Sequence, residues 1–166
     1  LGRYIRAIDD YTEVVRLRPD DQNAFYSRGY SYRQLGENEK AIDDYTEAIR
    51  LQPENDNAFF SRGSIYNEQG RHWEAIGDYK QAIGLGTDDS ELFGSRGYSY
   101  GELGEVEKAI NDYTGAIRLK PDSSLAFGLR SLCYQEINEY QRAMEDLIDA
   151  IRLEPDDPDW FNERGL

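Results

Sequence analysis

Arginine and aspartate recur along the chain at one fixed spacing, and both side chains can take part in binding chemistry. The arginines repeat every thirty-four positions, at Arg28, Arg62, Arg96, Arg130 and Arg164. The aspartates have the same period, at Asp10, Asp44, Asp78, Asp112 and Asp146. A row of guanidinium groups could bind an anionic ligand, because the planar fork of arginine matches carboxylate and phosphate oxygens. The matching row of aspartates favours the alternative, in which a carboxylate of the protein itself neutralises each arginine.

We predict that these residues form buried ion pairs that link helices. A pair can close within one row of thirty-four residues, as Arg28–Asp44, or between rows, as Arg62–Asp44, and the sequence leaves both closures open. The residues assigned to these structural pairs are Arg28, Arg62, Arg96, Arg130, Asp44, Asp78, Asp112 and Asp146.

The other residue types that catalyse reactions or bind metals do not combine into a site. The single histidine, His72, is far in register from the single cysteine, Cys133, so there is no metal-binding cluster and no nucleophile with a paired base. Neighbouring acids such as Asp43 and Asp44 point about 100° apart on a helix and do not converge on one substrate atom. The sequence therefore indicates no enzyme, no metal and no cofactor.

Charge and hydropathy narrow the classes of partner. The net charge is −14, which repels phosphate backbones and argues against nucleic-acid binding. No apolar run is long enough to cross a bilayer. The sequence has no initiator methionine, so we expect it to be an excerpt from a longer protein. The sequence does not determine the cellular compartment, and the cytoplasm is our expectation.

The elements that position these residues follow from the period. Rows of thirty-four residues align without insertion or deletion, and the rows are 1–21 (the back of a row), 22–55, 56–89, 90–123, 124–157 and 158–166 (the front of a row). In the first half of each row an aromatic residue stands four positions before a small one, as in Phe25 and Gly29, which is typical of one helical stripe. In the second half, Ala41, Tyr45 and Ala48 form another such stripe. Each full row is therefore predicted to be a pair of helices.

Glycine and proline mark the ends of these helices. A left-handed cap is expected at the end of the first helix of each row, at Gly2, Gly36, Gly70, Gly104 and Asn138. The second helix is followed by proline at Pro19, Pro53, Pro121 and Pro155. No alternating apolar and polar stretch indicates a strand. The chain is predicted to be all-α, with a helix at about 3–18, four helix pairs and a short final helix that starts near Pro158.

The pattern aromatic-x-x-x-G-x-x-Y, followed by A-x-x-x-Y-x-x-A and proline, resembles the tetratricopeptide repeat (TPR) family at its period of thirty-four residues. The resemblance covers essentially the whole chain and implies a single TPR array over 1–166. It also implies a right-handed superhelix of antiparallel helix pairs, in which the first helix of each row (helix A) lines the concave surface. The arginine column departs from the family pattern, which more often has an apolar residue there.

Ligands of TPR proteins usually lie along the concave face, so the resemblance implies a non-catalytic scaffold that binds a peptide or helix of a partner protein. The family's contact positions correspond here to Asn23, Tyr26, Tyr30, Arg33, Asn57, Phe60, Ser64, Asn67, Glu68, Tyr98, Glu102 and Glu136. The rings and the recurring glutamates predict a partner segment with apolar anchors and nearby lysine or arginine. Alternatively, the tyrosines serve only helix packing and the glutamates are only solvated. The alternative function is a structural or regulatory segment of a larger enzyme whose catalytic domain lies outside this sequence.

One known ligand of the family is not expected. TPR domains that bind the acidic C-termini of large heat-shock chaperones use a carboxylate clamp of lysine, asparagine and arginine side chains. The corresponding positions of this chain hold Tyr26, Tyr30, Ser61, Glu91 and Ser95. The clamp is missing, so we expect no chaperone tail as partner.

Two parts of the array are expected to be weak. In the row 56–89, Thr87 stands where the other rows have proline, and Gly84 stands where they have arginine. Gly77 lies inside the second helix of this row (helix B), where glycine lowers helix stability. We therefore expect a mobile joint near 84–89. At the ends, 1–18 is a helix B without its helix A, and 158–166 begins a helix A without its helix B. Weak head-to-tail self-association is therefore predicted, in which the last helix of one molecule packs on the first helix of the next.

Overall fold

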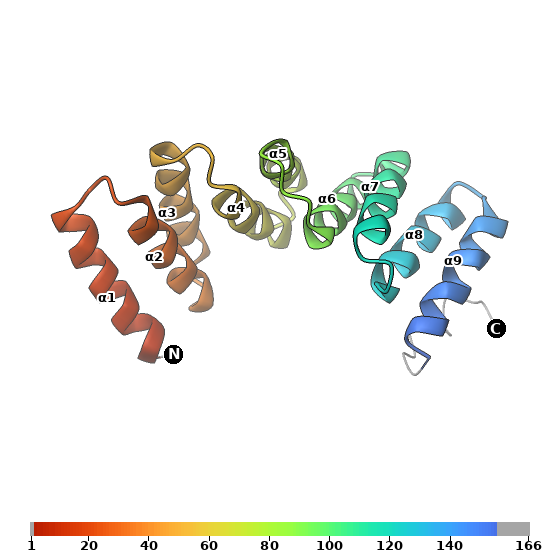
Figure 1. The fold of residues 1–166 in the computed structure, drawn as a ribbon, viewed down its shortest axis with the longest axis horizontal. Coiled ribbons are helices and arrows are strands. Elements are labelled where there is room, and N and C mark those ends of the chain that lie inside the picture. Colours follow the sequence, from red (N-terminus) through yellow and green to blue (C-terminus); the bar gives the residue numbers. More distant parts are fainter. Residues whose placement is uncertain (1, 156–166) are drawn as a thin grey trace. The chain divides into compact units, whose positions relative to one another are not determined.

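The computed structural model describes residues 2–155, which form nine α-helices and no strand (Figure 1). In chain order the helices are α1 (Gly2–Leu17), α2 (Gln22–Gln34), α3 (Asn38–Leu51), α4 (Asp56–Glu68), α5 (His72–Gly84), α6 (Ser90–Glu102), α7 (Val106–Leu119), α8 (Ser124–Glu136) and α9 (Tyr140–Leu153). The predicted all-α fold is confirmed. The even-numbered helices are helices A and the odd-numbered ones are helices B. The short final helix expected near Pro158 lies outside the described residues.

A polar side chain caps the start of each helix A. Asp21 accepts a hydrogen bond from the backbone amide of Ala24 at 3.1 Å. The side chains that cap α4, α6 and α8 are Asn55, Asp89 and Ser123. Such caps satisfy amide groups that have no partner in the first turn of a helix, and they fix where each row begins.

A residue with left-handed backbone forms the turn from helix A to helix B. The φ angle is 77° at Gly36, 73° at Gly70, 71° at Gly104 and 62° at Asn138, as predicted. Gly2 is the first residue of α1, and the residue before it lies outside the described residues, so the cap predicted at Gly2 stays a prediction.

Helices B end in two ways. The four that precede a proline end two residues before it, at Leu17, Leu51, Leu119 and Leu153. The fifth, α5, ends at Gly84, and the chain then turns through Gly86 with φ of 94°. The hydroxyl of Thr87 donates a hydrogen bond to Asp56 at 2.6 Å. A glycine turn and a side-chain hydrogen bond thus replace the proline in this row.

The chain divides into two compact units within the joint expected at 84–89, since one unit ends at Thr87 and the other begins at Asp88. In the first unit each of the helices α1 to α5 packs on the next in sequence. In the second unit α6 packs on α7, α7 on α8 and α8 on α9. Each unit is therefore a stack of antiparallel helices (Figure 1).

Glycines of helix A meet tyrosines of helix B in the core. A Cβ atom at Gly29 would lie 3.1 Å from Cε1 of Tyr45, and one at Gly63 would lie 3.0 Å from Cε1 of Tyr79. Both rings are buried, with 0% and 1% of their surface exposed. Because glycine has no side chain, the ring can lie directly against the backbone of helix A, and the two helices of a row approach closely.

Candidate partner-binding surface

Each arginine of the repeating column that the structure describes forms a two-point ion pair with an aspartate sixteen positions later. Arg28 donates from Nε to Oδ2 of Asp44 at 2.8 Å and from Nη2 to Oδ1 at 2.7 Å. The same two bonds, 2.6–2.8 Å long, join the pairs Arg62–Asp78, Arg96–Asp112 and Arg130–Asp146. The pairs therefore close within a row, which is one of the two closures that the sequence left open.

Further contacts hold these guanidinium groups in place. Nη1 of Arg62 donates to the hydroxyl of Thr46 on the preceding helix B at 2.8 Å. Its central carbon lies 5.9 Å from the ring centres of both Phe59 and Tyr66. The hydrogen bonds to Asp78 raise the pKa of Arg62. An anionic ligand would have to displace a carboxylate of the protein, which favours a structural role for this column.

The A-helix face of the first unit carries most of the side chains predicted to bind a partner. We define this face by Asn23, Tyr26, Tyr30 and Arg33 of α2 and Asn57, Phe60, Ser64, Asn67 and Glu68 of α4. Tyr26 packs on the buried Tyr45 with ring centres 5.5 Å apart, and Phe60 packs on Tyr79 at 6.0 Å. Tyr30 is 46% exposed. Rings that the core holds in position offer flat contact area at little cost in side-chain entropy.

The polar side chains of this face largely contact one another or their neighbours. Arg33 forms an ion pair with Glu68 at 2.6 Å, which joins α2 to α4. Oδ1 of Asn67 lies 2.9 Å from Nδ1 of His72, and the hydroxyl of Ser64 donates to the backbone of its own helix. The charges of Arg33 and Glu68 offset each other, so the aromatic rings are the main feature that the face presents to a ligand.

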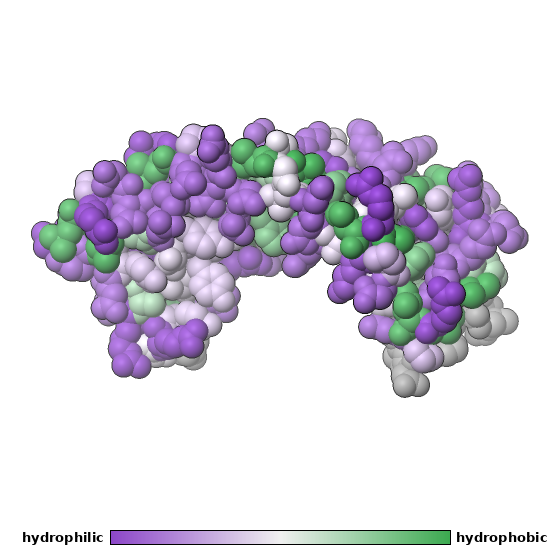
Figure 2. Space-filling model, in the orientation of Figure 1, coloured by the Kyte–Doolittle hydropathy of each residue, from purple (hydrophilic) through white to green (hydrophobic). Residues whose placement is uncertain are grey.

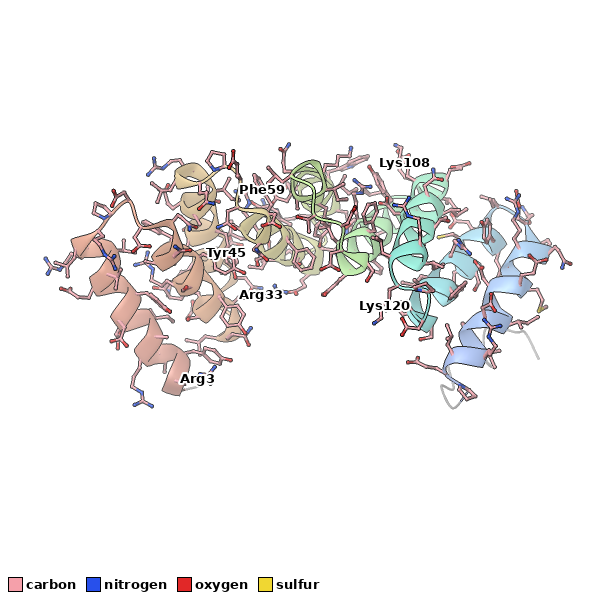
Figure 3. The ribbon with its side chains drawn as sticks, viewed as in Figure 1. Arg3, Arg33, Tyr45, Phe59, Lys108 and Lys120 are labelled. Atoms are coloured by element: carbon pink, nitrogen blue, oxygen red, sulfur yellow. The ribbon has the colours of Figure 1, made fainter. Side chains whose placement is uncertain are left out.

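A pocket of about 450 Å³ opens between α1 and α2 at the edge of this face. Its lining residues are Arg3, Tyr4, Ala7 and Tyr11 from α1 and Tyr26, Ser27, Tyr30 and Ser31 from α2. The rings of Tyr4 and Tyr30 meet edge to face with centres 6.4 Å apart. Figure 2 shows pale, weakly hydrophilic side chains gathered in the hollow between α1 and α2, and Figure 3 shows Arg3 near the start of α1.

Sequence reasoning did not assign the α1 side of this pocket. Ala7 and Tyr11 belong to columns whose members are buried in the other rows, such as Ala41 and Tyr45, which are both 0% exposed. The signal that could have identified them is the position of α1 as a helix B whose apolar stripe is not covered by a helix A of its own row within residues 2–155.

The second unit presents a smaller set of predicted contact residues. Tyr98 is 41% exposed, and burial together with the nearby charge of Glu102 and a hydrogen bond to it raises the pKa of Tyr98. On α8, Glu136 is exposed, as are Leu125 and Leu132, at 60% and 37%. This surface therefore combines an exposed ring, exposed leucines and exposed carboxylates, and we treat it separately from the A-helix face of the first unit.

The surroundings of Cys133 and of the residue types that bind metals do not favour reactivity or metal binding. Cys133 is buried, and its burial raises the pKa of the thiol to about 11, so little thiolate forms near neutral pH. Within residues 2–155, no three histidine, cysteine or acidic side chains group as a metal site. None of the helices in this described range has the length and the apolar character needed to cross a bilayer.

Two family models match the chain, one described as TPR repeat over 29–70 and one described as tetratricopeptide repeat over 95–166. A crystal structure of MamA is similar, with 25% identity, a TM-score of 0.89, and coverage of 93% of this chain and 90% of that one. YrrB, a TPR protein with an unusual peptide-binding site, has 22% identity, a TM-score of 0.90, and coverage of 99% and 85%. MamA from Desulfovibrio magneticus RS-1 has 18% identity, a TM-score of 0.86, and coverage of 95% and 89%. Among curated proteins, no relative matches the sequence.

Proposed function

Because the chain belongs to the tetratricopeptide repeat family, we propose that it is a non-catalytic scaffold that binds a segment of a partner protein on the A-helix face of its first unit. The fold is one that generally supports protein-interaction scaffolds. The observation that carries the proposal is the exposed ring of Tyr30, which stands beside a pocket of about 450 Å³ and next to the half-buried ring of Tyr26.

The chemistry of this face suggests the kind of partner. An aromatic or aliphatic side chain would be removed from water among the tyrosine rings, and such aromatic sites are enriched in binding hot spots. Glu68 is still more than half exposed beside Arg33, with a side-chain exposure of 54%, so a lysine or arginine of the partner can approach its carboxylate. The net charge of −14 favours the approach of a basic segment. The partner is therefore a peptide or helix with apolar anchors and nearby basic residues.

The second unit contributes a separate contact surface to this proposal. Tyr98, Glu102 and Glu136 combine an exposed ring with exposed carboxylates there. These are the same types of side chain as on the first unit, so the same class of partner segment fits both units. The solved structure of YrrB supports the proposal in a general way, because that TPR protein has a peptide-binding site.

Selection of peptides tests the proposal. The full chain is immobilised and a random peptide library is selected against it, and the affinity of each enriched peptide is then measured by fluorescence anisotropy. We expect enriched peptides to combine an aromatic or large aliphatic residue with lysine or arginine. The variant Tyr30→Ala/Phe60→Ala should bind them about tenfold or more weakly, because truncation of a hot-spot ring costs more than about 1 kcal/mol.

Two controls make the result specific. Trp73 is also exposed, at 58%, but it lies on helix B α5, so Trp73→Ala should leave the affinity unchanged. An acidic peptide that ends in a free carboxylate, like a chaperone tail, should not bind. The proposal is wrong if the enriched peptides bind the double variant as tightly as the original chain, or if Trp73→Ala weakens them equally.

A further inference from the structure

The leucines of α8 form a stripe along one face of that helix. Leu125, Leu129 and Leu132 stand at i, i+4 and i+7, a spacing that places side chains on the same side of a helix. Leu125 is 60% exposed, Leu132 is 37% exposed and Leu129 is partly buried. Single exposed leucines are common on protein surfaces, whereas three on one helical face form a patch that is typical of an interaction site. We name these three residues the leucine stripe.

The leucine stripe is exposed because of its register within the row. Asn23 and Tyr30 stand at the positions of Leu125 and Leu132 in the first full row, and both are exposed as well, although another helix A follows α2. Exposure at these positions is therefore a property of the repeat. Only the residue type differs, because the fourth full row has leucine at all three places and the other full rows have polar or aromatic side chains there.

In the first unit, two side chains of α2 reach across to the next helix A. The hydroxyl of Tyr26 lies 3.5 Å from the hydroxyl of Ser61 on α4. Arg33 forms its ion pair with Glu68 at 2.6 Å, also on α4. A ring and a guanidinium group of one helix A thus cover part of the same face on the following helix A.

In the second unit, α6 has no side chains at the corresponding positions, which are Gly94 and Gly101. A Cβ atom at either glycine would have no neighbouring atom within 4 Å, so the space above these positions is open. Leu129 and Glu136 stand in the columns of the two α4 residues that α2 contacts, and α6 itself contacts α8. The leucine stripe is therefore left uncovered on the side of α6.

An exposed carboxylate stands at the end of the stripe. Glu136 follows Leu132 by four residues, so it lies on the same face one turn beyond the last leucine. In the first unit this column holds Glu68, whose charge is offset by Arg33, whereas Gly101 offers no charge to Glu136. Glu136 is also the last residue of α8, where the helix dipole adds negative potential. A cation is therefore favoured at this end of the stripe.

We propose that the leucine stripe binds an amphipathic helix of a partner protein, and that a lysine or arginine of this helix pairs with Glu136, as Arg33 pairs with Glu68 in the first unit. The apolar side chains of the partner helix pack along the stripe, in the manner of helices that dock in apolar grooves. Removal of the leucine surface from water favours the contact, and the ion pair adds specificity. The inference rests on the proposed scaffold function, but it concerns α6 and α8 and not the A-helix face of the first unit.

A pair of designed peptides tests the proposal with the full chain. The probe is an amphipathic helical peptide with leucines at i, i+4 and i+7 and lysines at both ends, and its control has glutamate in place of every lysine. Fluorescence anisotropy measures the affinity of each peptide. The lysine peptide should bind, and the glutamate peptide should bind about tenfold or more weakly, because its carboxylates are repelled by Glu136.

The variant Leu125→Asn/Leu132→Ser tests the stripe itself. It gives α8 the residues that the row 56–89 has at these positions, so the fold should tolerate it, and circular dichroism verifies this. The lysine peptide should bind it about tenfold or more weakly, because less apolar surface is removed from water. Ile148 is also an exposed aliphatic residue, at 49%, but it lies on α9, so Ile148→Ser should leave the affinity unchanged.

The variant Gly101→Arg tests the ion pair. It places a guanidinium group where the first unit has Arg33, and the helix can accept it, since Gly101 has no positive φ and a Cβ there meets no neighbouring atom. The new arginine should pair with Glu136 and compete with the lysines of the peptide, which should then bind about tenfold more weakly. Gly101→Ala adds no charge and should change the affinity by less than about twofold.

The proposal is overturned if the lysine peptide does not bind the original chain, or if it binds Leu125→Asn/Leu132→Ser and Gly101→Arg as tightly as the original chain. It is also overturned if the peptide does not bind and sedimentation equilibrium shows self-association that Leu125→Asn/Leu132→Ser abolishes, because the stripe is then a contact between copies of this chain.

The variants of the first unit separate this inference from the proposed function. Tyr30→Ala/Phe60→Ala should bind the lysine peptide as the original chain does, because neither residue belongs to α6 or α8. Gly101→Arg should still bind the peptides whose affinity Tyr30→Ala/Phe60→Ala lowers. A failure of either proposal is therefore visible without the other.

Discussion

Arg62 binds Asp78 of its own row through two hydrogen bonds, of 2.8 and 2.7 Å, and at the same time donates to Thr46 of the preceding row. One guanidinium group therefore connects three helices, α3, α4 and α5. Arg28 and Arg130 have the corresponding contacts, to Thr12 and Thr114. The arginine column thus stabilises both the helix pair and its contact with the preceding helix B.

Removal of one carboxylate should show how much the ion pair contributes. Asp44 is 5% exposed and paired with Arg28, whereas its neighbour Asp43 is exposed. Asp44→Ala should lower the free energy of unfolding by about 3–5 kcal/mol, because it leaves a largely buried guanidinium without its counter-charge. Asp43→Ala should change it by less than about 0.5 kcal/mol. Urea unfolding of both variants gives the comparison, and equally small effects would show that the pair is not important for stability.

Two glycines of the first unit should respond in opposite directions to alanine. A Cβ at Gly63 would lie 3.0 Å from the buried ring of Tyr79, so Gly63→Ala should lower the free energy of unfolding by about 1–3 kcal/mol. Gly77 lies inside α5 with no atom within 4 Å of such a Cβ, so Gly77→Ala should raise it by about 0.5–1 kcal/mol. Thermal unfolding of the two variants measures both shifts. Stabilisation by Gly63→Ala would contradict the close packing of helix A on Tyr79.

The hydroxyl of Tyr45 should contribute nothing favourable to stability. The ring is 0% exposed, and its Oη atom makes no hydrogen bond of good geometry; the side chain of Ser61 is close enough only for a weak one. Because a buried hydroxyl without a partner loses its hydrogen bonds to water, Tyr45→Phe should leave the free energy of unfolding unchanged or raise it by up to about 1 kcal/mol. Tyr45→Ala, which removes the ring as well, should cost about 3–5 kcal/mol. A large loss in Tyr45→Phe would mean that the hydroxyl does have a partner in solution.

Stability should decline in alkaline solution, and Cys133 should contribute to the decline. Burial raises the pKa of its thiol from 9.0 to about 11, which favours the neutral form in the folded state. This contribution is fully present below pH 9, where the thiol of the unfolded chain is also neutral, and is lost as the pH rises through about 11. Burial also raises the pKa of Tyr45 and Tyr113, which adds to the loss at higher pH.

The variant Cys133→Ala isolates the thiol. Its free energy of unfolding should fall less steeply between pH 9 and 11 than that of the original chain, when both are measured by urea unfolding at several pH values. The same slope in both proteins would exclude a titrating thiol as a cause of the decline.

Most of the fold follows from local patterns that repeat. Gly36, Gly70, Gly104 and Asn138 were predicted as left-handed turns because few other residues adopt that backbone, and a helical stripe fixes which residues face inward. The sequence did not predict which of two arginines each aspartate would pair with. Asp44 is sixteen positions after Arg28 and eighteen before Arg62, and only the relative placement of neighbouring helices selects Arg28.

The candidate site was predicted less completely, because parts of it depend on contacts between rows. The ion pair of Arg33 with Glu68 joins two helices A across thirty-five positions and two different columns, so no single column reveals it. Tyr4 contacts Tyr30 at the edge of the site, because α1 has a different environment from the other helices B. A pattern of columns treats all rows alike, so it does not reveal such a difference.

Site-specific photo-crosslinking tests the proposed A-helix face most directly. The photoreactive residue benzoylphenylalanine is placed at position 30 of one sample and at position 73 of another, and each is irradiated with a peptide selected against the original chain. Both native side chains are exposed aromatic rings, Tyr30 at 46% and Trp73 at 58%, so they differ mainly in the helix that carries them. The account predicts a peptide adduct, detected by mass spectrometry, from position 30 and none from position 73. An adduct from position 73 alone, or equal yields from both positions, would contradict it.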